Sequence, residues 1–263
     1  MAFLELHFRS DALNLCVPVS VILPDGAKKA PEGATYRTLF LLHGLSDDHT
    51  IWERRTSIER YADERGIAVV MPEVGRSWYT DTADGANYLT YIGEELPEVC
   101  RGFFRGMSHR REDTFVAGLS MGGYGALKAA LTYPDRFGGC ASLSGALDVV
   151  SRTDRRLAND RERAAFLTEW RGIFGFDIER GDDLRGGRND LFALTRKHRE
   201  EGLPFPKIFL WCGTEDSLLI YNRNYHALLG DLGIPHGYAE SEGNHSWKWW
   251  DLHIQDAMDA LLQ

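Results

Sequence analysis

The sequence lacks the long apolar run that a membrane-spanning helix needs, because no stretch reaches roughly 18 to 20 consecutive apolar residues. The first ten residues also lack an unbroken apolar core, since Glu5, His7 and Arg9 interrupt it, so no secretory signal is expected. Positive charge is scarce as well: 30 Lys and Arg stand against 39 Asp and Glu, for a formal net charge of -9. This balance argues against a polyanionic partner. We therefore expect a cytoplasmic protein with neither a membrane nor a nucleic-acid partner.

Cysteine is sparse and scattered. The four cysteines are Cys16, Cys100, Cys140 and Cys212. Because no two of them form a CxxC pair, neither a zinc knuckle nor a dithiol redox site is indicated, and mostly buried thiols in a reducing compartment are the favoured interpretation. Asp47, Asp48 and His49 lie close together, but the polarity of an exposed loop explains them better than a metal site does. We expect no metal and no cofactor.

Two alternating apolar stretches open the chain. Leu4, Leu6 and Phe8 share one face, and residues 13–21 alternate in the same way. This pattern predicts an antiparallel hairpin with its turn around Ser10 and Asp11. Pro18 lies inside the second strand and predicts an edge or a bulge there.

Strand and helix patterns then alternate along the rest of the chain. Short apolar runs predict buried strands at 38–42, 67–71, 114–117, 139–143 and 208–212, with a last candidate at 236–241. Helical spacing lies between and after them, at 51–64, 121–133, 218–232 and 247–262. Pro97 predicts a kink or a new start in the apolar stretch 88–104. This alternation predicts an α/β fold with a mainly parallel, doubly wound sheet.

Residues 149–202 interrupt the alternation. They are rich in Arg, Asp, Glu and Gly and offer amphipathic pieces but no convincing strand. We predict that they form a cap-like helical insertion over the rim of the sheet, and a charged helical decoration without function is the alternative. No Pro/Ser linker marks a second domain, so residues 1–263 are expected to form one domain.

The most informative motif is Gly118-Leu119-Ser120-Met121-Gly122-Gly123, which follows a predicted strand and opens a predicted helix. A serine on such a tight turn projects its hydroxyl clear of the sheet, at a helix start where backbone N–H groups can meet developing negative charge. Ser120 is therefore the predicted nucleophile. A phosphate-binding loop would need a Lys after the glycines, where Tyr124 and Gly125 stand instead.

A serine nucleophile needs an imidazole base and a carboxylate that orients it, and in this kind of fold they follow in the order Ser, Asp or Glu, His. His245 follows the last strand candidate and is the predicted base. The competing histidines precede the sheet, lie in polar stretches or lie inside helices: His7, His109, His198, His226 and His253. Glu215 and Asp216 both follow the strand at 208–212, and spacing alone does not choose between them, although Asp216 leads.

Backbone donors for an oxyanion are expected from Met121 and from Leu45, in the His43-Gly44-Leu45 segment after the first central strand. A histidine at His43 more often holds its loop by hydrogen bonds than acts as a base. Three aromatic residues that flank the site in sequence are candidates for substrate binding: Trp78, Tyr79 and Trp247. Trp249 and Trp250, on the final helix, are expected to pack in the core.

Six segments together resemble the esterase D family of α/β-hydrolases, and the resemblance spans most of the chain. They are Ser120 with its glycines, His43-Gly44-Leu45, residues 75–81, residues 94–97, residues 213–216 and Asn244-His245. Within that family the chain is most similar to the bacterial tributyrin-type esterases. The resemblance implies an intracellular carboxylesterase of the α/β-hydrolase fold that acts on short acyl esters, and it favours Asp216 over Glu215 as the acid.

The chain departs from one branch of the resemblance, since S-formylglutathione hydrolases typically carry a cysteine where this chain has Asp47. We expect a small-molecule ester as substrate, and a homo-oligomer is compatible with the sequence. A feruloyl esterase or an S-formylglutathione-type thioesterase is the alternative enzyme. A ligand-binding homologue is the alternative that is not an enzyme.

Overall fold

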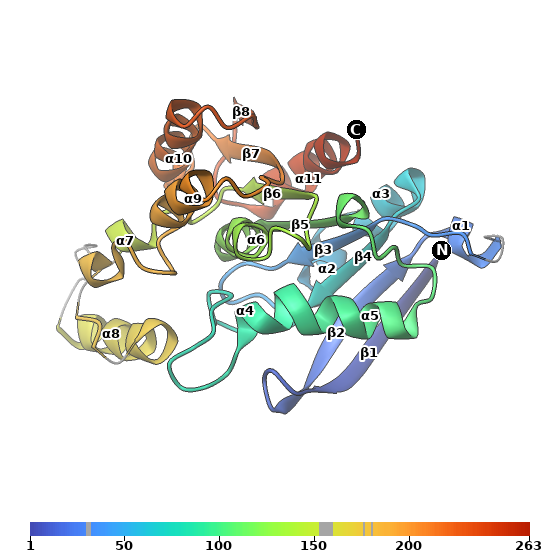
Figure 1. Cartoon of the computed structure of the whole chain (residues 1–263), viewed down its shortest axis with the longest axis horizontal. Coiled ribbons are helices and arrows are strands. Elements are labelled where there is room, and N and C mark those ends of the chain that lie inside the picture. Colours follow the sequence, from blue (N-terminus) through green and yellow to red (C-terminus); the bar gives the residue numbers. More distant parts are fainter. Residues whose placement is uncertain (30–32, 153–159, 176, 180) are drawn as a thin grey trace.

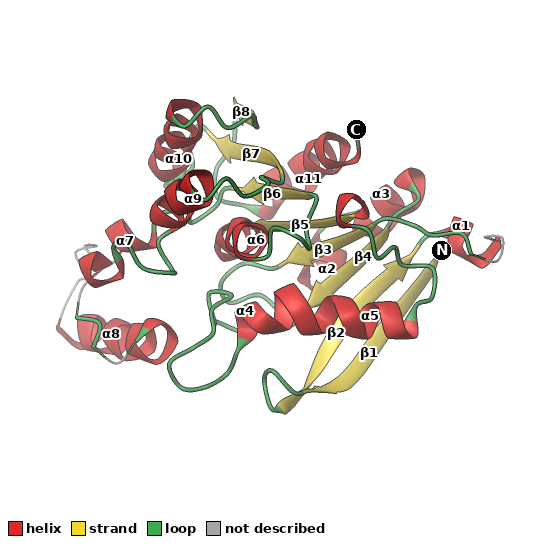
Figure 2. Ribbon diagram, in the orientation of Figure 1, coloured by secondary structure: helices red, strands yellow, loops and turns green. Residues whose placement is uncertain are grey.

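The computed structural model describes residues 1–29, 33–152, 160–175, 177–179 and 181–263. Within them one eight-stranded sheet has the order β1-β2-β4-β3-β5-β6-β7-β8 (Figures 1 and 2). The strands are β1 Ala2–Ser10, β2 Leu15–Leu23, β3 Thr38–Leu42, β4 Ala68–Pro72, β5 Thr114–Leu119, β6 Gly139–Leu143, β7 Lys207–Gly213 and β8 Gly237–Ser241. From β4 to β8 all neighbours are parallel, while β1 and β2 pair antiparallel. The predicted parallel sheet and N-terminal hairpin are confirmed.

Helices cover both faces of this sheet (Figure 2). They are α1 Asp25–Lys29, α2 Ile51–Arg55, α3 Ile58–Arg65, α4 Tyr88–Thr90, α5 Leu96–Phe103, α6 Met121–Thr132, α7 Val149–Arg152, α8 Asp160–Phe174, α9 Leu191–Glu200, α10 Leu219–Asp231 and α11 Trp247–Leu262. Alternate residues of β3 belong to two separate apolar clusters, with Phe40 packed toward α5 and α6 and Leu41 toward α3 and α11. The sheet is therefore doubly wound. Within the described residues, no helix combines the length and apolar character that crossing a membrane requires.

Pro18 sits where the β2–β4 ladder ends. The hairpin register runs without a bulge and pairs Pro18 with His7. On the other side of β2 the pairing with β4 begins only at Val19, and Pro18 O accepts a hydrogen bond from the Glu73 N–H. The missing N–H of Pro18 therefore faces the end of a ladder, where the loss of a donor is tolerated.

Two predicted helices are divided. The helix expected at 51–64 breaks at Thr56, which is extended (φ -136°) and whose hydroxyl accepts a hydrogen bond from the Ile58 N–H. Such local side-chain bonds compete with helix continuation. The stretch expected at 88–104 consists of α4, a π-helical turn at Tyr91–Glu95 and α5, which has Pro97 in its first turn. The backbone stays helical through both junctions, so the prediction of a kink or a new start at Pro97 corresponds to the change from the π-helical turn to α5 rather than to a break.

The described part of 149–202 is helical, with α7, α8, a 3₁₀ turn at Gly181–Leu184 and α9, and it contains no strand. Residues 153–159, 176 and 180 of this predicted insertion lie outside the described residues. An aromatic cluster joins α8 to the body of the protein, because Trp170 and Phe174 both pack against Trp78. Figure 1 places α7 and α8 at one end of the molecule, beyond α6 and α9.

Lys128, on α6, is a fully buried amine that joins three parts of the fold. Its Nζ donates to Thr80 Oγ1 and to Asn189 Oδ1, each at 2.7 Å. Thr80 belongs to the loop that follows β4, and Asn189 precedes α9. Burial lowers the pKa of Lys128 well below its usual value, because the charged amine is costly to desolvate.

We expect Lys128→Met to remove a pH dependence from the stability. A lowered lysine pKa means that the unfolded chain binds more protons than the folded protein does between the two pKa values, so the free energy of unfolding rises with pH in that window. Wild type should thus gain stability relative to K128M between neutral pH and about pH 9.5. Urea unfolding followed by tryptophan fluorescence measures this, with the exposed Lys197→Met as control. A stability difference that is the same at both pH values would contradict the expectation.

Candidate active site

Ser120 occupies a strained turn between β5 and α6. Its φ of 52° and ψ of -114° lie outside the regions that residues with a side chain normally adopt. The backbone on both sides holds the turn in place: the Ser120 N–H donates to Leu143 O, and Ser120 O accepts from the Ala146 N–H, both at 3.0 Å. The hydroxyl is therefore presented by a backbone that neighbouring strand ends fix.

The glycines around Ser120 are required by close backbone approach. A Cβ on Gly118 would lie 2.5 Å from the carbonyl of Gly122, and a Cβ on Gly122 would lie 2.4 Å from Leu42 O. A Cβ on Gly123 would lie 2.4 Å from Ser142 Oγ. All three distances are shorter than the contacts that Cβ atoms make in real proteins. The start of α6 can therefore lie this close to β3 and β6 only with glycine at these positions.

Two side chains from distant parts of the chain meet Ser120. His245, in the loop between β8 and α11, places Nε2 3.0 Å from Ser120 Oγ and Nδ1 2.8 Å from Asp216 Oδ2. Asp216 follows β7, and its side chain is fully buried, while the His245 side chain is about one-third exposed. Glu215 is exposed and makes no such contact with His245. The structure thus brings together Ser120, His245 and Asp216, as the sequence predicted.

The environment of Asp216 favours its ionised form. Burial acts to raise the pKa of this carboxyl, but hydrogen bonds from His245, the Leu218 N–H and Ser144 outweigh it, and the pKa is lowered. Ser144 Oγ also accepts a hydrogen bond from Trp250 Nε1 at 3.1 Å. Ser144 has a φ of 50° at the end of β6, directly before Gly145.

The loop after β3 is held from behind by His43. This side chain is fully buried, and its Nε2 accepts a hydrogen bond from the Val74 N–H at 3.2 Å. Its Nδ1 therefore carries the proton and donates to Gly44 O at 2.8 Å. With both nitrogens occupied, His43 fixes the loop, and it is not placed to take a proton from Ser120.

The two predicted oxyanion donors lie at the site. Leu45 lines the pocket in front of Ser120. Met121 is the first residue of α6, so its N–H is one of the amides that have no partner within the helix.

A pocket of about 330 Å³ opens over Ser120 and His245. Its lining residues are Gly44, Leu45, Asp47, Leu119, Ser120, His245, Ser246, Trp247 and Trp250. Trp247 therefore lies at the pocket, as the sequence predicted. Trp250 is 5% exposed and packs in the core as expected, yet it also forms part of the wall. No residue of the described part of 149–202 lines this pocket.

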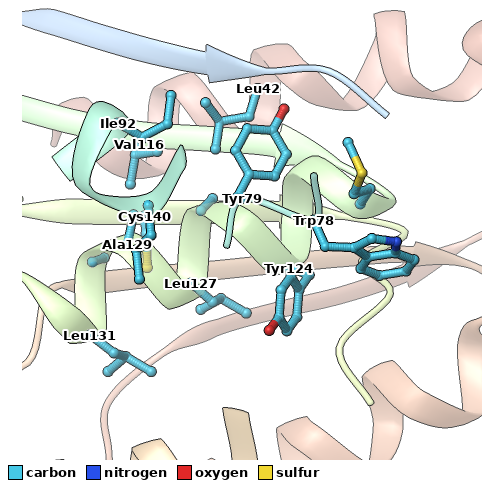
Figure 3. Close-up of a cluster of buried hydrophobic side chains, with 14 of the residues drawn as sticks. Leu42, Trp78, Tyr79, Ile92, Val116, Tyr124, Leu127, Ala129, Leu131 and Cys140 are labelled. Carbon is cyan, nitrogen blue, oxygen red and sulfur yellow. The ribbon is translucent and has the colours of Figure 1, made fainter. Parts of the chain in front are cut away.

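Trp78 and Tyr79, the other two candidates for substrate binding, are core residues. They are only 3% and 0% exposed and do not line the pocket at Ser120. Figure 3 shows both side chains packed among apolar residues beside α6. The Tyr79 hydroxyl donates to His43 O at 2.9 Å, so Tyr79 supports the loop after β3 from inside. Proximity to the site in sequence was misleading here, because both residues have a positive φ and turn inward.

A second hydroxyl–imidazole–carboxylate chain lies nearby. Ser241 Oγ is 3.1 Å from His253 Nε2, and His253 Nδ1 is 2.7 Å from Asp256 Oδ2. Ser241 Oγ already accepts from Trp211 Nε1 at 3.0 Å, and its φ is not in the left-handed region. Asp256 is largely exposed. The hydrogen-bond chain at Ser241 lacks the strained turn and the helix start that distinguish Ser120.

The side chains of Asp47, Asp48 and His49 do not converge on one point in the structure. Asp48 pairs with Arg54 at 3.1 Å, and His49 Nδ1 lies 3.3 Å from Glu73 Oε2. Among the residues that the structure describes, no group of three or more His, Cys, Asp or Glu side chains could hold a metal ion.

Comparison with known proteins shows to which family the chain belongs. The sequence profile of the Esterase family matches residues 10–261. The chain belongs to the Esterase family. An acetyl esterase of Caldicellulosiruptor saccharolyticus is 32% identical to this esterase over 99% of the chain and 98% of its own length.

Solved structures agree with this assignment. FphF, a fluorophosphonate-binding serine hydrolase of Staphylococcus aureus, superposes with a TM-score of 0.88 at 32% identity, over 100% of the chain and 98% of its own. An S-formylglutathione hydrolase (FrmB) of the same organism superposes with a TM-score of 0.85, also at 32% identity, over 100% and 99%. The esterase therefore has the α/β-hydrolase fold and is a carboxylic ester hydrolase.

Three residues at the site escaped the sequence analysis. The sequence suggests Asp47 only as part of a metal site or as a departure from relatives, and it favours core packing over a binding wall for Trp250, yet both line the pocket. Trp250 stands three residues after Trp247 on a helix, a spacing that places both on one face and could have found it. Ser144 carries no sequence signal that connects it to Asp216.

Gly122→Ala should destabilise the esterase by about 1–3 kcal/mol, because the new methyl group collides with the backbone of β3. Activity should fall as well, since the collision displaces the turn at Ser120. Gly230→Ala, in α10 with open space around the new Cβ, is the matched control and should be neutral or stabilising by about 0.5–1 kcal/mol. Chemical denaturation of both variants measures this. Equal stability of G122A and wild type would refute the close-approach argument.

Proposed function

We propose that this esterase is a serine carboxylesterase for short-chain acyl esters, of the esterase D family and closest in type to tributyrin esterases. In this proposal Ser120 is the nucleophile, His245 the general base and acid, and Asp216 the carboxylate that orients His245. The observation that carries it is the unbroken hydrogen-bond chain from Ser120 Oγ through His245 to Asp216, at 3.0 Å and 2.8 Å.

Acylation follows from this geometry. Ser120 Oγ donates its hydrogen bond to His245 Nε2, so the imidazole can take the proton as Oγ attacks the ester carbonyl. Asp216 accepts from Nδ1 and stabilises the imidazolium that forms. His245 then protonates the alcohol that leaves. In the second half, water loses a proton to His245 and attacks the acyl-enzyme, which releases the acid and restores Ser120.

The tetrahedral intermediate of each half carries a negative oxygen. We propose that the backbone N–H groups of Leu45 and Met121 bind it, because Leu45 lines the pocket and Met121 opens a helix whose positive dipole end faces developing charge.

The size of the pocket supports short acyl groups. Its volume of about 330 Å³ is near the lower end of the roughly 300 to 1,000 Å³ typical of ligand sites. Leu45, Leu119 and the two tryptophans give it an apolar wall. The similarity to a protein named acetyl esterase points in the same direction.

An S-formylglutathione-type thioesterase is the second candidate, because a hydrolase of that name is 32% identical over the whole chain. The same three residues would serve a thioester. Feruloyl ester hydrolysis has weaker support: a ferulic acid esterase with a TM-score of 0.78 is 20% identical and shares the fold alone.

We also propose that 1–263 is a single domain in which 149–202 is an insertion fastened to the nucleophile helix. The Tyr124 hydroxyl donates to Asn189 O at 2.8 Å, and Lys128 donates to Asn189 Oδ1. The insertion can therefore support α6 from behind without forming the wall of the pocket.

Ser120→Ala should reduce hydrolysis of p-nitrophenyl acetate by at least about four orders of magnitude with little change in stability, since the nucleophile is lost. It should also abolish labelling by a fluorophosphonate probe. Ser241→Ala is the matched control, because Ser241 also contacts a histidine that contacts an aspartate. S241A should keep both activity and labelling. Near-normal turnover by S120A would overturn the proposal.

Asp216→Asn should lower kcat by about a thousandfold or more, because an amide no longer favours the productive tautomer of His245. Glu215→Gln should stay within about twofold of wild type, since Glu215 is exposed and makes no contact with His245. Steady-state kinetics with p-nitrophenyl acetate compares the two. Equal losses in D216N and E215Q would leave Asp216 without its proposed role.

A further inference from the structure

Asp47 places a carboxylate beside the nucleophile. The chain turns back after Leu45, with Ser46 at a φ of 70° and the Asp47 N–H donating to Gly44 O at 3.3 Å. A point at the Cβ position of Gly44 is 3.0 Å from Asp47 Oδ2 and 3.8 Å from Ser120 Cβ. One carboxylate oxygen of Asp47 and the side chain of Ser120 therefore flank the same small space.

No cationic side chain neutralises this carboxylate. Throughout the described part of the chain, no Lys, Arg or His nitrogen lies within ion-pair distance of Asp47. Arg54, which acts on Asp47 only through its charge, is hydrogen-bonded to other groups: its Nη2 contacts both oxygens of Asp48, and its Nε donates to Thr50 Oγ1 at 2.8 Å. Burial raises the pKa of the Asp47 carboxyl and outweighs the opposing effects of His43, of a hydrogen bond from the Gly44 backbone and of Arg54.

The remaining wall of the pocket suits a cation. Apart from His245, Asp47 is the only ionisable residue among the described residues that line it. Trp247 and Trp250 line the same pocket, with their rings nearly perpendicular and their centroids 5.3 Å apart. Indole faces attract ammonium groups, and a carboxylate in the same pocket adds to that attraction.

From this arrangement we propose, on the basis of the proposed function, that the pocket at Ser120 prefers esters that carry a cationic group, with Asp47 as the residue that recognises the charge. Neutral esters are hydrolysed less efficiently, and anionic esters, among them glutathione thioesters, least. Trp247 and Trp250 provide the aromatic wall against which the cationic group rests.

A matched substrate pair isolates the charge. Acetylthiocholine and 3,3-dimethylbutyl thioacetate have nearly the same shape and differ in a quaternary nitrogen against a carbon. S-acetylglutathione supplies the anionic case, and release of the thiol is followed with the same disulfide reagent for all three. We expect wild type to favour acetylthiocholine over its neutral analogue by at least about fivefold in kcat/KM, the scale of one charge acting a few ångströms away in a partly exposed site.

Asp47→Asn should bring the cationic-to-neutral ratio close to one and raise the relative rate with S-acetylglutathione. Asp48→Asn is the control, because it removes the same charge from the neighbouring residue, which pairs with Arg54 and does not line the pocket. D48N should keep the wild-type ratio. A ratio near one in wild type, or a ratio that D47N leaves unchanged, would overturn the proposal.

If no thioacetate is turned over, protection of Ser120 from fluorophosphonate labelling provides the same comparison. Choline should protect wild type at least about fivefold better than 3,3-dimethylbutan-1-ol does, and equal protection would overturn the charge preference. The charge preference is tested separately from the proposed catalytic roles of Ser120, His245 and Asp216. Persistent hydrolysis by S120A would refute Ser120 as nucleophile without changing the charge ratio.

Discussion

The close approach of α6 to the ends of β3 and β6 is the constraint on which the site depends. A Cβ on Gly122 would lie 2.4 Å from Leu42 O, and a Cβ on Gly123 would lie 2.9 Å from Gly145 Cα, which is closer than real Cβ atoms come to backbone. This contact forces the strained φ at Ser120, and it also brings the loop after β3 to the start of the helix. The position of Leu45 relative to Met121 is therefore set by the same packing that exposes the serine. One backbone arrangement therefore positions both the proposed nucleophile and the proposed oxyanion donors.

Buried polar groups hold this arrangement rigid from the inside. His43 uses both ring nitrogens, Tyr79 donates to the carbonyl of His43, and Lys128 spans from α6 to Thr80 and Asn189. Each donor named here has an acceptor within hydrogen-bond distance, so the cost of burying it is offset and the loops gain a fixed geometry. A site that must keep a serine and an imidazole about 3 Å apart benefits from such support, because small displacements reduce catalysis strongly.

The residues that the structure brings together as the sequence predicted are those with a local signature. Buried strands appear as apolar runs, the turn at Ser120 appears as glycines at fixed spacing, and Ser120, Asp216 and His245 meet because each follows a strand that ends at the same edge of the sheet. Tyr79 was misplaced because its direction depends on a positive φ and on space above Gly125, where a Cβ would lie 2.4 Å from the tyrosine ring. That space is a property of two distant segments, and no pattern within either one reveals it.

The net charge of the chain also does not predict the local charge in the pocket at Ser120. The formal charge of -9 is a sum over the chain, whereas hydrogen bonds compensate the buried carboxylate of Asp216, and among the described residues no ion pair is formed by Asp47. In the proposed mechanism, a carboxylate so near Ser120 would oppose the negative oxygen of the tetrahedral intermediate. A cationic substrate group beside Asp47 would remove that opposition at the moment when the charge develops. The interaction is then stronger in the transition state than in the ground state, so its benefit should appear in kcat as well as in KM.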